Sequence, residues 1–129
     1  ARYPDGYVRI NDPQELIDMT THAHGKAVLD ELRPLHRELR HAIPDVYKGF
    51  GELHKAAFTA GALDAKTKEL IALAIAVTQQ CDGCIAAHAK GAFRKGASRA
   101  EVSEMLGVTI MMNGGPGTVY APRGKSAGS

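Results

Sequence analysis

The chain has 129 residues, which is enough for one domain and too few for two of ordinary size. Apolar residues make up 44% of it but aromatic residues only 5%, so we expect a core of aliphatic side chains and alanine. Such a composition suits closely packed helices better than a β-sandwich. Sixteen basic residues nearly balance fourteen acidic ones, with no basic block, so we predict no nucleic-acid partner and no anionic-membrane partner.

The only two cysteines lie together in the segment Cys81-Asp82-Gly83-Cys84. A secreted disulfide scaffold joins distant segments through several bridges, and this arrangement excludes that class. The longest apolar run, residues 70–77, is far shorter than a membrane span, and no charged-then-apolar leader begins the sequence. These features predict a soluble, cytoplasmic protein.

The first part of the chain changes from an extended pattern to a helical one. Residues 1–12 carry turn formers and no apolar period, which predicts an extended N-terminal arm. Asp12 then suits the N-cap of a helix, with a proline at the first helical position, where it is tolerated. Pro34 must either kink or divide this helix. The apolar stripe that supports the helix consists of Val28, Leu32, Leu35 and Leu39.

Two further helices are predicted before the cysteines. Pro44 opens the first, which keeps apolar residues on one face until Gly61 ends it. Asp64 suits the N-cap of the second, from Ala65 to about Gln80, which is apolar around almost its whole circumference. We expect such a helix to be buried by its neighbours or by other subunits.

The remaining chain predicts two more helices and a tail. Residues 84–95 form the first, and Ser98 begins the second with a capping box. The glycine-rich residues 113–117 then stop that helix, and residues 121–129 are predicted to be a flexible tail. We find no strand pattern and no internal repeat, so residues 13–120 are predicted to form one all-α domain, a compact bundle of five or six helices.

The main chemical signal is the spacing Cys81-x-x-Cys84-x-x-x-His88. On a helix these three side chains share an arc of roughly 60°. A disulfide between cysteines three residues apart constrains little chain, which favours a redox use over a structural one. The positive end of a helix lowers the pKa of a thiol such as Cys84, and His88 one turn later can accept its proton. The alternatives are inert buried thiols or a zinc site, for which two thiolates and one histidine are too few ligands.

Glu69 is the other candidate site residue. It lies near the start of an apolar helix, where it either compensates the helix dipole at the surface or orients His88 and relays a proton. Twelve residues of continuous helix would place it about 18 Å from Cys81, so the chain must fold back or another subunit must supply the carboxylate. Solvated faces are the interpretation for the histidines that lie among charged residues, His36, His41 and His54.

Glu69, eleven further residues and then Cys81-x-x-Cys84-x-x-x-His88 resemble the signature of the AhpD-like alkylhydroperoxidases, in the carboxymuconolactone decarboxylase superfamily. The resemblance extends from about Pro44 to Ala121. It implies an all-helical homo-oligomer, a trimer or hexamer, with no metal and no cofactor. Cys84 would be the peroxidatic thiol, Cys81 would resolve it to a disulfide, and His88 with Glu69 would form the proton relay. The reductant would be a dithiol partner such as a lipoyl domain or a thioredoxin-like protein.

The sequence therefore predicts a thiol-dependent peroxidase or disulfide oxidoreductase that reduces hydroperoxides through a CxxC dithiol–disulfide cycle. The chain departs from the longer alkylhydroperoxidases in having a single helical unit and in carrying Gly83 where they tend to carry a histidine. Two alternatives use the same residues. One is a non-catalytic redox sensor or interaction module with the disulfide as its switch. The other is a lyase acting on a small lactone or keto acid through Glu69 and His88.

Overall fold

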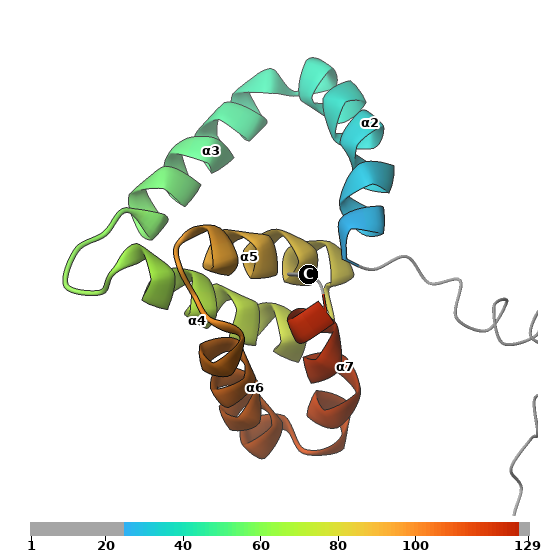
Figure 1. The fold of residues 1–129 in the computed structure, drawn as a ribbon. Helices are drawn as coiled ribbons and strands as arrows, with labels where there is room; N and C mark the ends of the chain where they lie inside the picture. The colour runs from blue at the N-terminus through green and yellow to red at the C-terminus, as the bar shows by residue number, and fades with distance from the viewer. Residues whose placement is uncertain (1–24, 127–129) are drawn as a thin grey trace, which may run out of the picture.

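The computed structural model describes residues 25–126, which form six helices and no strand (Figure 1). The all-α prediction is confirmed. The predicted arm of residues 1–12 and the helix start at Asp12 lie outside the described residues. The helices are α2 (Lys26–Ala42), α3 (Pro44–Phe58), α4 (Ala65–Thr78), α5 (Asp82–Arg94), α6 (Arg99–Asn113) and α7 (Gly115–Ser126).

The helices form two parts of different character (Figure 1). Helices α4–α7, residues 65–126, pack together as a compact unit that we call the body. Helices α2 and α3, residues 26–58, form a bent pair that we call the arch. The arch contacts the body at both of its ends, where α2 meets α5 and where α3 leads into α4.

The core of the body is built from small and aliphatic side chains, as the composition predicts. Leu73 and Val77 of α4 are buried against Ile85 and Ala89 of α5, and Val102 of α6 completes the same cluster. Alanines between the larger side chains let α4 and α5 approach closely. Their packing side by side in opposite directions positions the candidate site.

Local capping starts two of the body helices where the sequence predicts. The Asp64 side chain accepts a hydrogen bond from the Thr67 N–H at 2.7 Å, which begins α4. The Ser98 hydroxyl accepts one from the Glu101 N–H at 3.1 Å, which begins α6. The reciprocal half of the predicted capping box is replaced, because the Glu101 carboxylate lies 3.2 Å from the ammonium of Lys66.

The C-terminal end of the described chain differs from the prediction. Gly114 ends α6 with a φ of 67°, and α7 starts at the next residue. Residues 121–126, expected in a flexible tail, continue α7, and Ala121 is buried in the core. The small residues that suggested disorder instead allow close packing, since a Cβ atom at Gly124 would lie 3.3 Å from Leu106. Residues 127–129 lie outside the described part.

The arch is helical but has no buried residue in either helix. Pro34 lies inside α2 without dividing it, because α2 runs unbroken from Lys26 to Ala42. The apolar faces that the sequence predicts on these helices are left open by the rest of residues 25–126, and Phe50 is 65% exposed. None of the helices within residues 25–126 is long and apolar enough to cross a membrane.

Candidate active site

The two cysteines lie at the start of α5. Cys81 is the N-cap residue, its sulfur accepts a hydrogen bond from the Cys84 N–H at 3.3 Å, and a disulfide joins the pair. The prediction that this helix begins at Cys84 is wrong by two residues, since Asp82 and Gly83 already belong to its first turn. The Cys81 sulfur caps this helix, for which the sequence predicted no N-cap. Both cysteines are half-buried, so a small reactant or a partner can reach them.

His88 of α5 and Glu69 of α4 lie within ion-pair distance of each other. His88 Nδ1 lies 2.9 Å from Glu69 Oε2. The chain reverses after Thr78, with Gln80 at a φ of 56°, and α5 then runs back along α4. A continuous helix would have kept Glu69 about 18 Å from Cys81. Because the chain folds back, Glu69 reaches His88 within the same chain, and no second subunit is needed to supply this carboxylate. Glu69 is only 8% exposed, which contradicts the interpretation as a surface residue.

Gly91 makes room for this buried carboxylate. It lies one turn after His88 on the same face of α5. A Cβ atom at position 91 would lie 2.6 Å from Glu69 Cδ and 2.7 Å from both carboxylate oxygens. Only a glycine leaves that volume free, so the geometry makes Gly91 a positioning residue. The sequence offered no signal for it, because the requirement comes from a side chain on another helix.

The arch adds aromatic rings to the site. The Phe58 ring stacks on His88, with centroids 5.4 Å apart and planes 8° from parallel. His54, one turn earlier in α3, stacks on Phe58 at 4.4 Å and lies 6.4 Å from His88. His54 is exposed, as predicted, but its ring contacts with Phe58 and His88 were not predicted from the sequence. The spacing of four residues between His54 and Phe58 places them on one face, which is the only local signal.

Helix α7 holds the first turn of α5 from the other side. Arg123 Nη1 lies 2.7 Å from Asp82 Oδ1, and its guanidinium lies 4.6 Å from the centroid of the Tyr120 ring. Asp82, one of the two residues between the cysteines, is thus held by a segment that the sequence assigned to the tail. The ion pair couples the position of α7 to the geometry of the cysteine pair.

All four predicted site residues come together on the α4–α5 pair. Cys84 and His88 are one turn apart on α5, Cys81 caps that helix, and Glu69 reaches His88 from α4. The arrangement places an imidazole–carboxylate pair one turn from a disulfide-bonded cysteine pair, a combination whose chemistry is suited to moving a proton on and off sulfur. Within the described chain, no three His, Cys, Asp or Glu side chains gather as they would around a metal ion.

Comparison with known proteins agrees with this architecture. Residues 44–123 match the carboxymuconolactone decarboxylase family. An uncharacterized protein of Cupriavidus necator is 40% identical over 98 residues, 76% of this chain and 87% of that protein. The uncharacterized protein 4 of the cox locus of Paracoccus denitrificans is 43% identical over 72 residues, 56% of this chain and 65% of that protein.

Two crystal structures resemble the fold. The apo structure of a carboxymuconolactone decarboxylase family protein from Legionella pneumophila has a TM-score of 0.74 at 40% identity, covering 77% of this chain and 88% of that one. A protein of Thermotoga maritima has a TM-score of 0.69 at 28% identity, covering 78% and 88% of the two chains. The chain belongs to the carboxymuconolactone decarboxylase family.

Proposed function

We propose that this protein is a thiol-dependent peroxidase of the alkylhydroperoxidase type. The observation that carries the proposal is the Glu69–His88 contact at 2.9 Å, on the helix that carries the Cys81–Cys84 disulfide. A disulfide across three residues adds little stability, so its value lies in being formed and broken. The neighbouring acid–base pair is what a thiol needs to become a nucleophile at neutral pH.

In the first step Cys84 attacks the hydroperoxide. His88 accepts the Cys84 proton, and the Glu69 carboxylate stabilises the imidazolium that results. The thiolate forms a bond to the terminal peroxide oxygen while the O–O bond breaks, which leaves a sulfenic acid on Cys84 and an alkoxide. The alkoxide takes up the proton held by His88 and leaves as an alcohol.

In the second step Cys81 resolves the sulfenic acid. Its sulfur attacks the sulfur of Cys84, the S–S bond forms, and the hydroxyl leaves with a proton as water. A dithiol partner, such as a lipoyl domain or a thioredoxin-like protein, then reduces the disulfide by exchange and becomes oxidised itself. The cycle needs no metal and no cofactor. The identity of this partner and the cytoplasmic location stay predictions.

A redox sensor is the second candidate, and the Arg123–Asp82 contact favours it. That ion pair joins the turn between the cysteines to α7, and Gly83 packs near Leu32 of α2, where an added Cβ would lie 3.2 Å from that side chain. Opening the disulfide can therefore shift α7 through the Arg123–Asp82 ion pair and α2 through the contact of Gly83 with Leu32. A sensor would be oxidised once by peroxide without repeated turnover and would change its assembly or its partner.

We also propose that the protein is a homo-oligomer, a trimer or hexamer. Large apolar side chains are open on both parts of the chain, and a single copy leaves them in contact with water. On the body they are Ile71, Ile75, Val108, Met111, Met112 and Val119. Sedimentation equilibrium tests this directly, and a monomer at micromolar concentration would contradict it.

Peroxide consumption with a set of dithiol donors tests the function. Wild type is expected to turn over with dihydrolipoamide or reduced thioredoxin, while Cys84→Ser abolishes turnover and Cys81→Ser stops after one oxidation. Wild-type oxidation without turnover would support the sensor. The lyase alternative would be supported by full activity on a lactone or keto acid in the double Cys→Ser variant. Unchanged peroxide turnover in Cys84→Ser would contradict the assigned roles.

A further inference from the structure

One face of α2 carries a row of basic side chains, which we call the α2 basic row. Lys26, Arg33, Arg37 and Arg40 are spaced by seven, four and three residues, so at about 100° per residue their directions fall within an arc of roughly 60°. All four are exposed. The two glutamates of α2 point roughly 140–160° away from Arg33 around the helix. The row is not a basic block in the sequence, and only the helix brings its charges together.

The rest of residues 25–126 leaves the row with little countercharge. Arg33 pairs with Asp30 at 3.2 Å, but the two side chains are 66% and 49% exposed, so the pair is weak. A hollow of about 360 Å³ lies along the row, and the described residues around it include no Asp or Glu. They are Leu29, Arg33, His36, Arg37 and Arg40. An acidic side chain from another molecule can lie in this hollow between the guanidinium groups.

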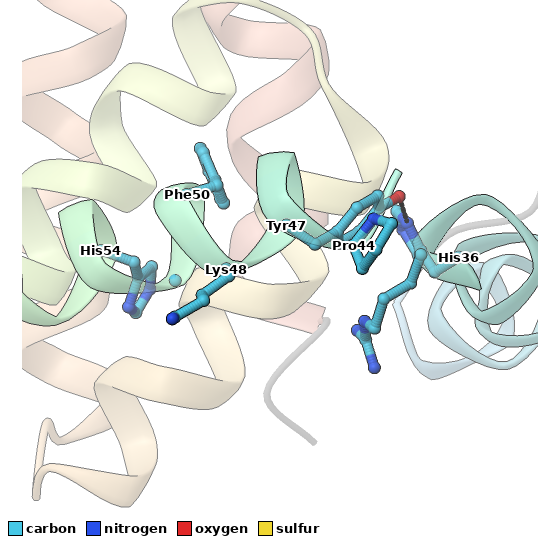
Figure 2. A pocket seen from close by; sticks show the side chains of 8 residues that line it. His36, Pro44, Tyr47, Lys48, Phe50 and His54 are labelled. Atoms are coloured by element: carbon cyan, nitrogen blue, oxygen red, sulfur yellow. Dashed lines mark hydrogen bonds between the residues drawn. The ribbon is translucent and has the colours of Figure 1, made fainter. Parts of the chain in front are cut away.

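The C-terminal end of the row is fixed where α2 meets α3. The Arg40 guanidinium lies 5.4 Å from the centroid of the Tyr47 ring, and the Tyr47 hydroxyl lies 3.2 Å from His36 Nδ1 (Figure 2). Arg40 also lines a second hollow, of about 620 Å³, together with Lys48 of α3. Positive charge therefore continues from α2 around this corner onto α3.

The row lies beside the disulfide. Leu32, the neighbour of Arg33, packs on the turn between the cysteines, where a Cβ at Gly83 would lie 3.2 Å from the Leu32 side chain. Lys26 and Arg40 lie about 9 Å and 12 Å from Leu32 along the helix axis, on its two sides. A protein interface of about 800 Å² per partner is a disc of roughly 16 Å radius. A protein bound over the disulfide therefore covers the whole row, whereas a small dithiol does not.

We propose that the α2 basic row binds an acidic protein that carries the reducing dithiol. The row binds carboxylates of this partner, and the partner's dithiol reaches the Cys81–Cys84 disulfide. The charge of Asp82, between the cysteines, is compensated by Arg123 at 2.7 Å. This inference rests on the proposed function and names the chemistry of its reductant.

The reaction in this complex is thiol–disulfide exchange. One thiolate of the partner attacks a sulfur of the disulfide, the S–S bond breaks, and a mixed disulfide forms while the released cysteine takes up a proton. The partner's second thiol then attacks the partner sulfur of the mixed disulfide and releases the other cysteine as a thiol. The partner gives two electrons and two protons and leaves as a disulfide. The row takes no part in these bonds, so it acts on the rate of encounter.

Matched peptides isolate the charge of the reductant. One peptide carries a dihydrolipoyl-lysine and four glutamates, and the other has four glutamines in their place. Each is mixed with the disulfide form of the protein, and the second-order rate constant for the appearance of cysteine thiols is measured. Wild type is expected to react roughly tenfold faster with the glutamate peptide at low salt, and this ratio should fall toward one as salt rises. Equal rate constants at low salt would overturn the proposal.

Matched variants show whether the row is the cause of the preference. Arg33→Gln/Arg37→Gln removes two charges of the row, and Arg94→Gln/Arg99→Gln removes two exposed charges at the end of α5 and the start of α6. The first should lower the ratio to about twofold or less, and the second should leave it unchanged. Arg33→Glu/Arg37→Glu should make the glutamine peptide the faster one, while uncharged dihydrolipoamide reduces all variants alike. Equal losses in the two glutamine variants would overturn the proposal.

These rate constants need no peroxide, so they separate this inference from the proposed function. A preference for the glutamate peptide in a protein that consumes no peroxide would support the row and contradict the peroxidase. Peroxide turnover with dihydrolipoamide, without any preference between the peptides, would support the peroxidase and overturn the row. Binding of a DNA duplex to the row, without faster reduction by the glutamate peptide, would also overturn it.

Discussion

The body and the arch are both helical, yet they bury their apolar residues very differently. Leu73, Val77 and Ile85 of the body are at most 1% exposed, whereas Val46, Phe50 and Leu53 of the arch are more than 60% exposed. The arch helices are amphipathic, so they have an apolar face, but no other element within residues 25–126 covers it. The comparison indicates that the body is held by its own core, while the arch is held to the body through contacts at its two ends.

The candidate site joins the two parts. The body supplies the dithiol, the imidazole and the carboxylate, all held by α4 and α5. The arch supplies the rings of Phe58 and His54. We therefore expect changes in the body to affect the chemistry and the stability, and changes in the arch to affect access and assembly.

The largest effect should come from the carboxylate in the body. Glu69→Gln keeps the shape of the side chain but removes the charge that stabilises a protonated His88, so peroxide turnover should fall by roughly 10²- to 10⁴-fold. Phe58→Leu, on the arch side of the same imidazole, should lower turnover much less. Steady-state kinetics with hydrogen peroxide measures both variants. Similar losses in the two would contradict the division between body and arch.

The next largest difference should appear when an apolar side chain of the body and one of the arch are truncated and the two losses of stability are compared. Leu73→Ala removes a fully buried side chain and should lower the free energy of unfolding by about 2–5 kcal/mol. Leu53→Ala removes an exposed one and should change it by less than about 0.5 kcal/mol in the monomer. Denaturant unfolding at low protein concentration measures these values. At high concentration Leu53→Ala should weaken assembly, and a loss equal to that of Leu73→Ala at low concentration would contradict the comparison.

The glycine beneath Glu69 should have a smaller effect, confined to the site. Gly91→Ala places a methyl group against the carboxylate and should shift it away from His88, with a loss in turnover of roughly tenfold. Gly107→Ala is the matched control, because its added Cβ meets nothing within 4 Å. The control should gain about 0.5–1 kcal/mol in stability from helix propensity and keep its turnover. Full turnover in Gly91→Ala would show that the carboxylate position is not critical.

The smallest effect concerns the cap of α4. Hydrogen bonds from the Thr67 side chain and backbone lower the pKa of the Asp64 carboxyl below its ordinary value. A lowered folded-state pKa gives stability that is present above the ordinary value and lost as the pH falls through the folded value. Asp64→Asn keeps a cap without titration, so the difference between wild type and this variant should shrink on acidification. Thermal unfolding between neutral and strongly acidic pH measures it, and a difference that grows on acidification would contradict this assignment.

Prediction from sequence worked where the cause is local. The caps at Asp64 and Ser98 depend on side chains three residues from the groups they bond. The shared face of Cys84 and His88 follows from helix geometry alone. The prediction of a flexible tail over residues 121–126 was wrong, because glycine and serine content indicates disorder only when no neighbouring helix offers a packing surface. Here α7 packs on α4 and α6.

The sequence by itself determined the helical class, the starts of α3, α4 and α6 and the dithiol–imidazole spacing, because these depend on neighbours within one or two turns. Only the tertiary structure decided that Glu69 lies 2.9 Å from His88, that Gly91 makes room for it and that Phe58 stacks on the imidazole. Each of these contacts joins residues on different helices. Their distances depend on the reversal after Thr78 and on how closely alanine lets α4 and α5 approach, which no local pattern contains.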